Sequence, residues 1–305
     1  MKLGFFTACL PGVPLADVAS WAAATGYEAL EVACWPVSPD RPFTASHLDV
    51  TADADRLAEA ASVVADHGLT ISSLAFYGNN LDPDPAERAA THAHVERCLE
   101  AAAVLGVPTV GTFVGRDWTR SVRQNLDTAE EVFKPLVDRA GELGVKIVIE
   151  NCVMEGWHPD GYPGNLAYSP ELWEWMFDQG LYLNYDPSHL VWMGIDPVAA
   201  LRPYVGRTAH VQAKDVQLFP EKRNRYGWTG KAVHRDNPWD VGWWRYRVPG
   251  LGEVDWRGVV DALYEGGFTG AVSVEHEDPL WGGTEAKVKT GLEIAYRTLR
   301  PLIVE

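Results

Sequence analysis

The stretch "LGVKIVIEN", residues 143–151, contains the pattern that decides the fold of this chain. Leu143 and Gly144 are typical of a helix end, because glycine readily adopts the left-handed backbone that closes a helix. The following "VKIVI" is β-branched and apolar and predicts a short buried strand. Glu150 and Asn151 then place polar groups at the end of that strand. The same succession recurs in "HGLTI" (67–71), "LGVPTV" (105–110) and "GGFTGAV" (266–272).

Eight such strands alternate with helical patterns along the chain. The predicted strands span residues 2–8, 29–34, 70–76, 109–114, 146–151, 182–186, 208–215 and 271–277. The predicted helices span residues 15–25, 53–67, 86–105, 121–143, 170–179, 197–203, 255–266 and 284–299. Eight units without a linker predict an α/β fold, a single (β/α)8 TIM barrel that occupies residues 1–305. A doubly wound open sheet is the alternative, but no glycine-rich phosphate-binding sequence follows any predicted strand.

The composition argues against several classes of function. The 305 residues carry a formal net charge of −16, whereas nucleic-acid binding and anionic membrane surfaces require a basic protein face. No stretch is long and apolar enough for a transmembrane helix, and "MKLGFFTACLPG" does not resemble a signal peptide. Four widely spaced cysteines suit free thiols in a reducing compartment. We therefore expect a cytoplasmic protein that binds a small ligand and neither nucleic acid nor membrane.

Polar side chains gather at the ends of the predicted strands. They are Glu31, Glu150, Asp186 with His189, then His210, Gln212 and Lys214, and finally Glu275. In a barrel the carboxyl ends of all strands meet at one mouth, where active sites lie. Carboxylates crowded there raise one another's pKa unless a cation compensates them. Two Glu, one Asp and a neutral group suit one divalent ion such as Mn²⁺, Mg²⁺ or Zn²⁺. The alternative is that Lys214 neutralises the carboxylates without a metal.

Residues 216–250 connect the seventh and eighth predicted strands by a segment much longer than an ordinary loop. It contains seven basic residues, three acidic residues and four of the thirteen tryptophans. Its position predicts an active-site loop or lid at the barrel mouth. Arg245 and Arg247 are candidates to bind a substrate carboxylate or phosphate through their forked donors. A structural or subunit-contact role is the alternative for "WWRYR" (243–247).

A wider series of motifs resembles the xylose isomerase-like TIM barrel superfamily, the sugar phosphate isomerases and epimerases. The motifs are "KIVIEN", "NYDPSHL", "HVQAKD", "PGLGEVDW" and "GAVSVEHED", and the resemblance covers almost the whole chain. In ketose 3-epimerases of this superfamily, Glu, Asp, His and Glu on strands five to eight hold one metal ion. The resemblance therefore implies that Glu150, Asp186 and Glu275 are metal ligands.

The fourth ligand is where this sequence departs from the family pattern. The second His of a His-x-His pair is usual, but here that position is Gln212, and His210 is the first member. Both residues remain candidates. Gln212 lies one pleat nearer the mouth, which favours it and leaves His210 as a substrate contact. A neutral amide oxygen would favour Mn²⁺ or Mg²⁺ over Zn²⁺.

The resemblance implies a divalent-metal-dependent sugar isomerase or epimerase that works through a metal-stabilised enediolate. Glu150 and Glu275 would remove and return the α-proton, while His189 and Lys214 would contact sugar oxygens. One alternative is a lyase or deglycosidase that acts on 3-keto glycosides by β-elimination through the same enediolate. Another is a non-catalytic sugar-binding subunit. A homo-oligomer or a partner subunit is compatible with each.

The endonuclease IV branch of the same superfamily is argued against on two grounds. That branch places additional His residues on its third and fourth strands. Here those strands end in "SSLAF" (72–76) and "VGTFV" (110–114), which contain no His. The acidic net charge is also unsuited to a DNA backbone.

Overall fold

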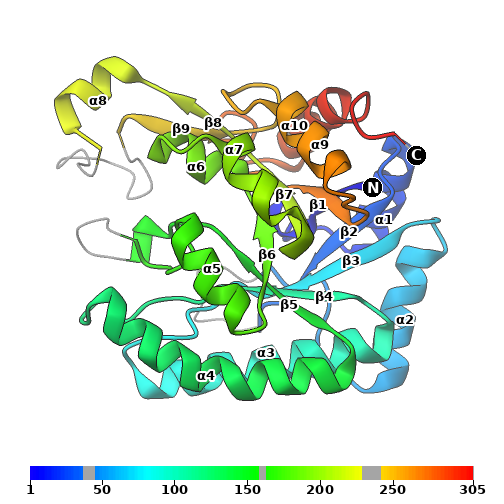
Figure 1. Ribbon diagram of the computed structural model, residues 1–305. Helices are drawn as coiled ribbons and strands as arrows, with labels where there is room; N and C mark the ends of the chain where they lie inside the picture. The colour runs from blue at the N-terminus through cyan, green and yellow to red at the C-terminus, as the bar shows by residue number, and fades with distance from the viewer. Residues whose placement is uncertain (37–44, 158–162, 229–241, 305) are drawn as a thin grey trace.

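The computed structural model describes residues 1–36, 45–157, 163–228 and 242–304. Its centre is a closed barrel of eight parallel strands in the order β1-β10-β7-β6-β5-β4-β3-β2 (Figure 1). The strands are β1 (Lys2–Phe6), β2 (Ala29–Ala33), β3 (Thr70–Ala75), β4 (Thr109–Thr112), β5 (Lys146–Glu150), β6 (Tyr182–Tyr185), β7 (Thr208–Ala213) and β10 (Ala271–Val274). The predicted (β/α)8 barrel is confirmed, and the open doubly wound sheet is wrong because β1 closes the barrel against β10.

Helices follow the strands and cover the outside of the barrel, as the adjacent α3 and α4 show in Figure 1. The α-helices around the barrel are α1 (Leu15–Thr25), α2 (Ala54–Ala65), α3 (Pro85–Leu105), α4 (Val122–Leu143), α5 (Pro170–Asp178), α6 (Pro187–Met193), α7 (Pro197–Leu201), α9 (Trp256–Glu265) and α10 (Glu285–Leu299). Short 3₁₀ turns lie at η1 (Thr7–Cys9), η2 (Glu155–Trp157) and η3 (Arg202–Arg207). Within the described ranges, no helix is long and apolar enough to cross a membrane.

Local sequence signals set the helix boundaries. Ser121 and Gln124 form a reciprocal capping box at the start of α4, which satisfies backbone donors that a first turn leaves unpaired. The same helix ends at Gly144, which has φ +68°, a left-handed conformation that residues with a Cβ rarely adopt. The chain then turns directly into β5. The motif at residues 143–151 therefore folds as predicted.

The barrel strands are buried on both faces, which explains their nearly continuous apolar composition. In β5, Ile147, Val148 and Ile149 are all at most 2% exposed. Burial continues to the end of the strand, where Glu150 is also 2% exposed. A carboxylate at that depth needs a partner, because desolvation of a charge without compensation is costly. The end of β5 is therefore a polar site inside an otherwise apolar wall.

The segment after β7 is more regular than a loop. β7 ends at Ala213, two residues earlier than predicted, and the chain resumes after Lys214 as β8 (Asp215–Leu218). This strand pairs antiparallel with β9 (Trp244–Arg247), and α8 (Pro220–Tyr226) follows β8. Figure 1 shows this ribbon and α8 projecting from one side of the barrel. Residues 229–241 of the predicted loop lie outside the described residues.

Asp215 joins this ribbon to the segment that leads into α9. Its carboxylate accepts hydrogen bonds from the backbone N–H groups of Val216 (2.8 Å), Gly250 (3.0 Å) and Val254 (3.0 Å). It also accepts one from the indole Nε1 of Trp256 (3.1 Å). The "KD" pair (214–215), which follows β7, and the "PGLGEVDW" motif (249–256) are therefore one structural unit, although 33 residues lie between Asp215 and Pro249.

Candidate functional site

Three carboxylates surround the ammonium group of Lys214 at the mouth of the barrel. Lys214 Nζ lies 2.7 Å from Glu275 Oε2, 3.1 Å from Asp186 Oδ2 and 3.8 Å from Glu150 Oε1. These carboxylates come from the ends of β10, β6 and β5, and one oxygen of each lies within 4.8 Å of the others. All four residues are buried. The structure thus brings together the acidic residues that the strand pattern predicted.

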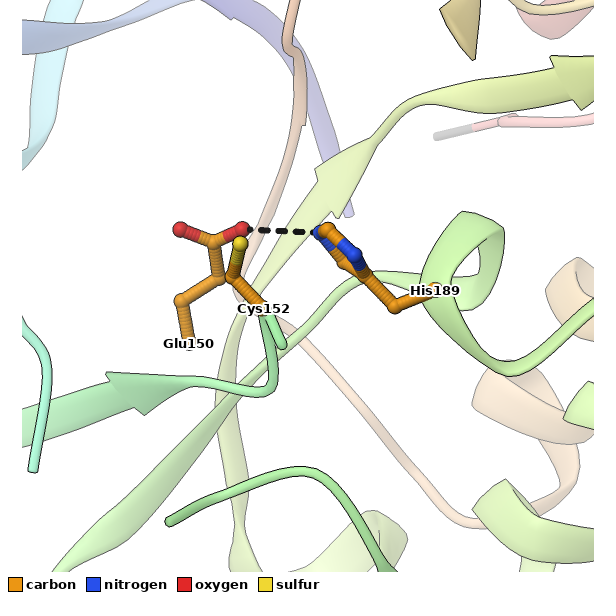
Figure 2. Close-up of side chains that lie close together, drawn as sticks. All are labelled: Glu150, Cys152 and His189. Atoms are coloured by element: carbon orange, nitrogen blue, oxygen red, sulfur yellow. Dashed lines mark ion pairs between the residues drawn. The ribbon is translucent and has the colours of Figure 1, made fainter. Parts of the chain in front are cut away.

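His189 extends this cluster from the first turn of α6. Its Nε2 lies 3.2 Å from Asp186 Oδ2 and 3.4 Å from Glu150 Oε1. Figure 2 shows the imidazole ring facing the Glu150 carboxylate, with the thiol of Cys152 beside them. Burial raises the pKa of Cys152 to about 12, which keeps the thiol protonated. One potential ligand atom of each of Glu150, Cys152 and His189 lies within 4.8 Å of the others, so these residues form a second candidate group for a metal ion.

The charges in the cluster stabilise one another. Burial alone would raise the pKa of Asp186, but the nearby Lys214 and His189 outweigh it and lower that pKa to about 2. Burial opposes protonation of Lys214, yet the carboxylates of Glu275, Glu277, Asp186 and Glu150 raise its pKa well above the ordinary value. Burial raises the pKa of Glu275 well above its ordinary value, even though Lys214 lies beside it. The site therefore contains an ionised Asp186 next to a protonated Lys214.

Gln212 and His210 lie successively deeper along β7. Gln212 Nε2 donates to Glu31 Oε1 (3.1 Å) and to the Tyr77 hydroxyl (3.0 Å). His210 contacts Asn184 Oδ1 through Nδ1 (3.0 Å) and Ser72 Oγ through Nε2 (3.1 Å). Burial lowers the pKa of His210 to about 3, so its ring is neutral. Both ring nitrogens of His210 therefore have hydrogen-bond partners, at a level of the barrel below the carboxylate cluster.

Three buried oxygen atoms in this region are candidate ligands for a divalent cation. Glu150 Oε1, Asp186 Oδ2 and Gln212 Oε1 are inaccessible to water and accept no hydrogen bond in the part of the chain that the structure describes. The first two are in ion-pair contact with Lys214 and His189. Buried polar atoms are almost always satisfied, so such a group calls for a further ligand. Carboxylate and amide oxygens suit hard divalent ions. The residues present therefore fit a metal ion.

The two predicted arginines contact other partners. Arg245 donates to Gln217 Oε1 through Nε (3.1 Å) and Nη2 (2.7 Å), and Arg247 donates to the same atom (2.8 Å). Arg247 Nε also donates to buried Asp278 Oδ2 (2.7 Å). The structure does not bring either guanidinium group into the contacts of the carboxylate cluster. Tyr246, between them on β9, points the other way.

Tyr246 is a site residue that sequence reasoning missed. Its hydroxyl lies 3.1 Å from His189 Nδ1, and its ring centre lies 4.5 Å from Lys214 Nζ. Side chains alternate along a strand, so the pattern "WRYR" would have separated Tyr246 from both arginines. This separation is predictable only if residues 244–247 are recognised as a strand. The aromatic face over a buried ammonium also stabilises its charge.

An aromatic cavity of about 270 Å³ adjoins the network below the carboxylates. Its aromatic lining consists of Trp35, Phe76, Tyr77, Trp118 and Trp157. Tyr77 belongs to both features, because its hydroxyl donates to Glu31 Oε1 at 2.6 Å while its ring lines the cavity. Aromatic faces of this kind are suited to the apolar side of a small ligand.

Two curated relatives are similar in sequence. Uncharacterized protein YfiH of Bacillus subtilis is 28% identical over 333 aligned residues, which cover 98% of this chain and 99% of the relative. An inosose dehydratase of Clostridium tetani is 33% identical over 157 aligned residues, 49% of each chain. The latter match therefore spans about half of either protein.

Two solved structures illustrate the similarity of fold. The 3-keto-D-glucoside 4-epimerase YcjR from E. coli superimposes with a TM-score of 0.69 at 15% identity, over 99% of both chains. IolI protein with a bound zinc atom superimposes with a TM-score of 0.68 at 22% identity, over 99% of this chain and 96% of the other. The relatives with a named activity are enzymes, in agreement with the expectation of an enzyme. The family model for the xylose isomerase-like TIM barrel matches residues 19–298, and with the closed barrel and its strand-end carboxylates this shows that the chain belongs to that family.

Proposed function

We propose that this protein is a divalent-metal-dependent sugar isomerase or epimerase that removes and returns a proton beside a carbonyl group. The observation that carries the proposal is the grouping of Glu150, Asp186 and Glu275, with one oxygen of each within 4.8 Å of the others at the barrel mouth. Isomerases and epimerases of this kind need a base, an acid and a means to stabilise negative charge on the substrate.

Glu150, Asp186, Gln212 and Glu275 would hold the metal ion. When bound, a divalent ion supplies Lewis-acid stabilisation of negative charge on neighbouring substrate oxygens. The oxygen-rich donor set favours Mn²⁺ or Mg²⁺, whereas the IolI structure contains zinc. Metal analysis of the purified protein distinguishes these ions, and a protein that binds no divalent ion would contradict the proposal.

Glu150 and Glu275 would act as the acid–base pair. They come from β5 and β10, which are separated in the barrel by β6 and β7, so their carboxylates approach the mouth from different directions. One removes the α-proton and the other returns it. Return to the opposite face of the same carbon gives epimerisation, and return to the neighbouring carbon gives aldose–ketose isomerisation. His189 and Lys214 would hydrogen-bond sugar oxygens.

Elimination from a keto sugar is a second candidate function. It begins with the same proton removal but ends with loss of the group on the β-carbon. The similarity over about half the chain to an inosose dehydratase favours this alternative. A 3-keto glycoside or a keto-cyclitol would then be the substrate class.

Solvent exchange in D₂O separates these functions. A panel of ketoses, aldoses and keto glycosides is incubated with metal-loaded protein and followed by mass spectrometry and NMR. Deuterium at the α-carbon with an epimer or isomer as product supports the first function, and release of water or an aglycone supports the second. Binding of a sugar without exchange or product would instead support the non-catalytic alternative.

A further inference from the structure

The amide group of Gln212 is held at one end only. Its Nε2 contacts Glu31 Oε1 at 3.1 Å and the Tyr77 hydroxyl at 3.0 Å, while its Oε1 is buried and without a hydrogen-bond partner among the described residues. Gln212 and Glu31 are both 0% exposed, so water does not compete for these bonds. The unpaired oxygen is an unusual feature, because a buried amide oxygen normally accepts a hydrogen bond.

The two neighbours of that amide end can only accept. Tyr77 has a single hydroxyl hydrogen, which it donates to Glu31 Oε1 over 2.6 Å. Its oxygen is therefore an acceptor toward Gln212, and Glu31 Oε1, which accepts the Tyr77 hydrogen, is an acceptor as well. Only the NH₂ end of an amide can satisfy both. A flipped Gln212 would set its oxygen against two other acceptors.

Asn184 and His210, the next residues in this hydrogen-bond network, also fix which atoms donate and which accept. Asn184 Nδ2 donates to the Tyr77 oxygen at 2.8 Å, which leaves the Tyr77 hydrogen no alternative to Glu31. Asn184 Oδ1 faces His210 Nδ1 at 3.0 Å, so that nitrogen carries the hydrogen. Donors therefore point in one direction from His210 through Asn184 and Tyr77 to Glu31.

From this polarity we infer that Glu31 and Tyr77 are positioning residues that fix the Gln212 amide with its oxygen free for the divalent ion. The inference rests on the proposed function, because it assigns the unpaired Oε1 to that ion. It also explains how a glutamine serves at a position where a free amide could otherwise present its NH₂ group. Carboxylates that hydrogen-bond a metal ligand orient it in the same way.

The test is a titration of the metal-depleted protein with Mn²⁺ at about pH 8, in which binding is measured by calorimetry and by the EPR signal of free Mn²⁺. Glu31→Gln introduces a donor beside the amide and removes its fixed polarity. We expect Mn²⁺ to bind about 10- to 100-fold more weakly to this variant, the usual effect of losing such a partner. Tyr77→Phe is expected to weaken binding in the same direction.

Tyr185→Phe is the matched control for Tyr77→Phe. It also removes one buried hydroxyl, which donates to Pro197 O at 2.6 Å outside this network. We expect it to lower thermal stability and leave the Mn²⁺ affinity unchanged. If both tyrosine variants weaken Mn²⁺ binding equally, the effect is general and the inference is wrong.

A double-mutant cycle separates positioning from a merely structural effect. In a Gln212→Ala background there is no amide to orient, so Glu31→Gln should leave the Mn²⁺ affinity unchanged. An equal loss in both backgrounds would overturn the inference, as would wild-type affinity in Glu31→Gln and Tyr77→Phe. Failure of the wild-type protein to bind Mn²⁺ would overturn the proposed metal site itself, a different result from normal binding in the variants. If Glu31→Gln does not fold, Tyr77→Phe alone decides.

Discussion

Lys214 Nζ lies 2.7 Å from Glu275 Oε2, and the same ammonium group stands among the carboxylates that we propose as metal ligands. An ammonium group and a divalent ion repel each other, so both cannot share that position. Glu277, which is half-exposed, lies 3.1 Å from the same nitrogen and gives it an alternative partner nearer solvent. Lys214 thus supplies positive charge when no divalent ion is bound.

The first prediction concerns Lys214→Met. Without the ammonium group, the metal-free protein contains buried carboxylates with no compensating cation. We expect the free energy of unfolding to fall by about 3–5 kcal/mol in EDTA, as when one partner of a buried ion pair is removed. Mn²⁺ should restore most of this loss and should stabilise the variant more than the wild type. Thermal unfolding with and without Mn²⁺ measures both effects.

Lys134→Met is the control for this variant, because Lys134 is exposed and pairs with exposed Asp138 on α4. Its stability should match the wild type under both conditions. A Lys214→Met protein that is as stable as wild type in EDTA would show that the ammonium group does not compensate the carboxylates.

The second prediction tests the acid–base pair. Glu150→Gln and Glu275→Gln keep an oxygen that can bind a metal but cannot take up a proton. We expect kcat for any accepted sugar to fall by about 100- to 10,000-fold in each variant, the range for loss of a general acid or base. Deuterium incorporation from D₂O should fall in parallel while bound metal is retained.

Glu171→Gln, at an exposed position in the first turn of α5, serves as the control and should retain full turnover. Undiminished exchange in Glu150→Gln with metal bound would refute the role of Glu150 as a base.

The third prediction separates the two arginines of β9. Arg247 pairs with Asp278, which is 1% exposed, so Arg247→Met leaves a buried carboxylate without its cation. We expect a loss of about 3 kcal/mol in the free energy of unfolding. Arg245 is partly exposed and contacts Gln217, so Arg245→Met should cost less stability. Chemical denaturation of both variants measures the difference, and equal losses would contradict this distinction.

Arg245→Met also tests whether Arg245 binds an anionic substrate. If it does, Arg245→Met raises KM for a phosphorylated or carboxylated sugar and leaves KM for the neutral sugar unchanged. If the substitution changes KM by the same factor for the anionic and the neutral sugar, Arg245 does not bind the anionic group.

The fourth prediction is a pH dependence that originates away from the candidate site. His47 Nε2 lies 3.2 Å from Leu10 O and 3.1 Å from Val13 O. Burial lowers its pKa below the ordinary value of 6.5 and outweighs these two carbonyl groups. Below that value the unfolded chain binds a proton that the folded His47 does not, so acid destabilises the folded protein.

His47 should therefore contribute a loss of stability as the pH falls from about 7.5 to about 5.5, so the wild type should lose more stability, or gain less, than His47→Asn over this interval. Urea unfolding at both pH values checks this result. Parallel pH dependences in the wild type and His47→Asn would show that His47 does not contribute.

Much of the barrel and its carboxylates is predictable because both follow short-range rules. The alternation of short apolar segments with helical patterns identifies all eight barrel strands. A parallel barrel then places every strand end at one mouth, so Glu150, Asp186 and Glu275 had to converge. The predicted grouping of these residues needed no knowledge of side-chain contacts.

The remainder of the site depends on pairings between distant residues. Tyr246 reaches His189 only because Val216 pairs with Tyr246 across the β8–β9 ribbon. The tertiary partner of Arg247 is Asp278, 31 positions along the chain. The local pattern of aromatic and basic residues does not reveal partners that are distant in the sequence. It therefore indicated Arg245 and Arg247 and not Tyr246 between them.

Asp215 gives the molecule a form of modularity. Its carboxylate binds the backbone where segment 216–250 begins, at Val216, and where it ends, at Gly250. One carboxylate therefore holds both ends of the segment beside Lys214, the residue before Asp215. We expect changes of length between β8 and β9 to leave Lys214 above the carboxylates, whereas changes within β9 would remove the contacts of Tyr246 with His189 and of Arg247 with Asp278.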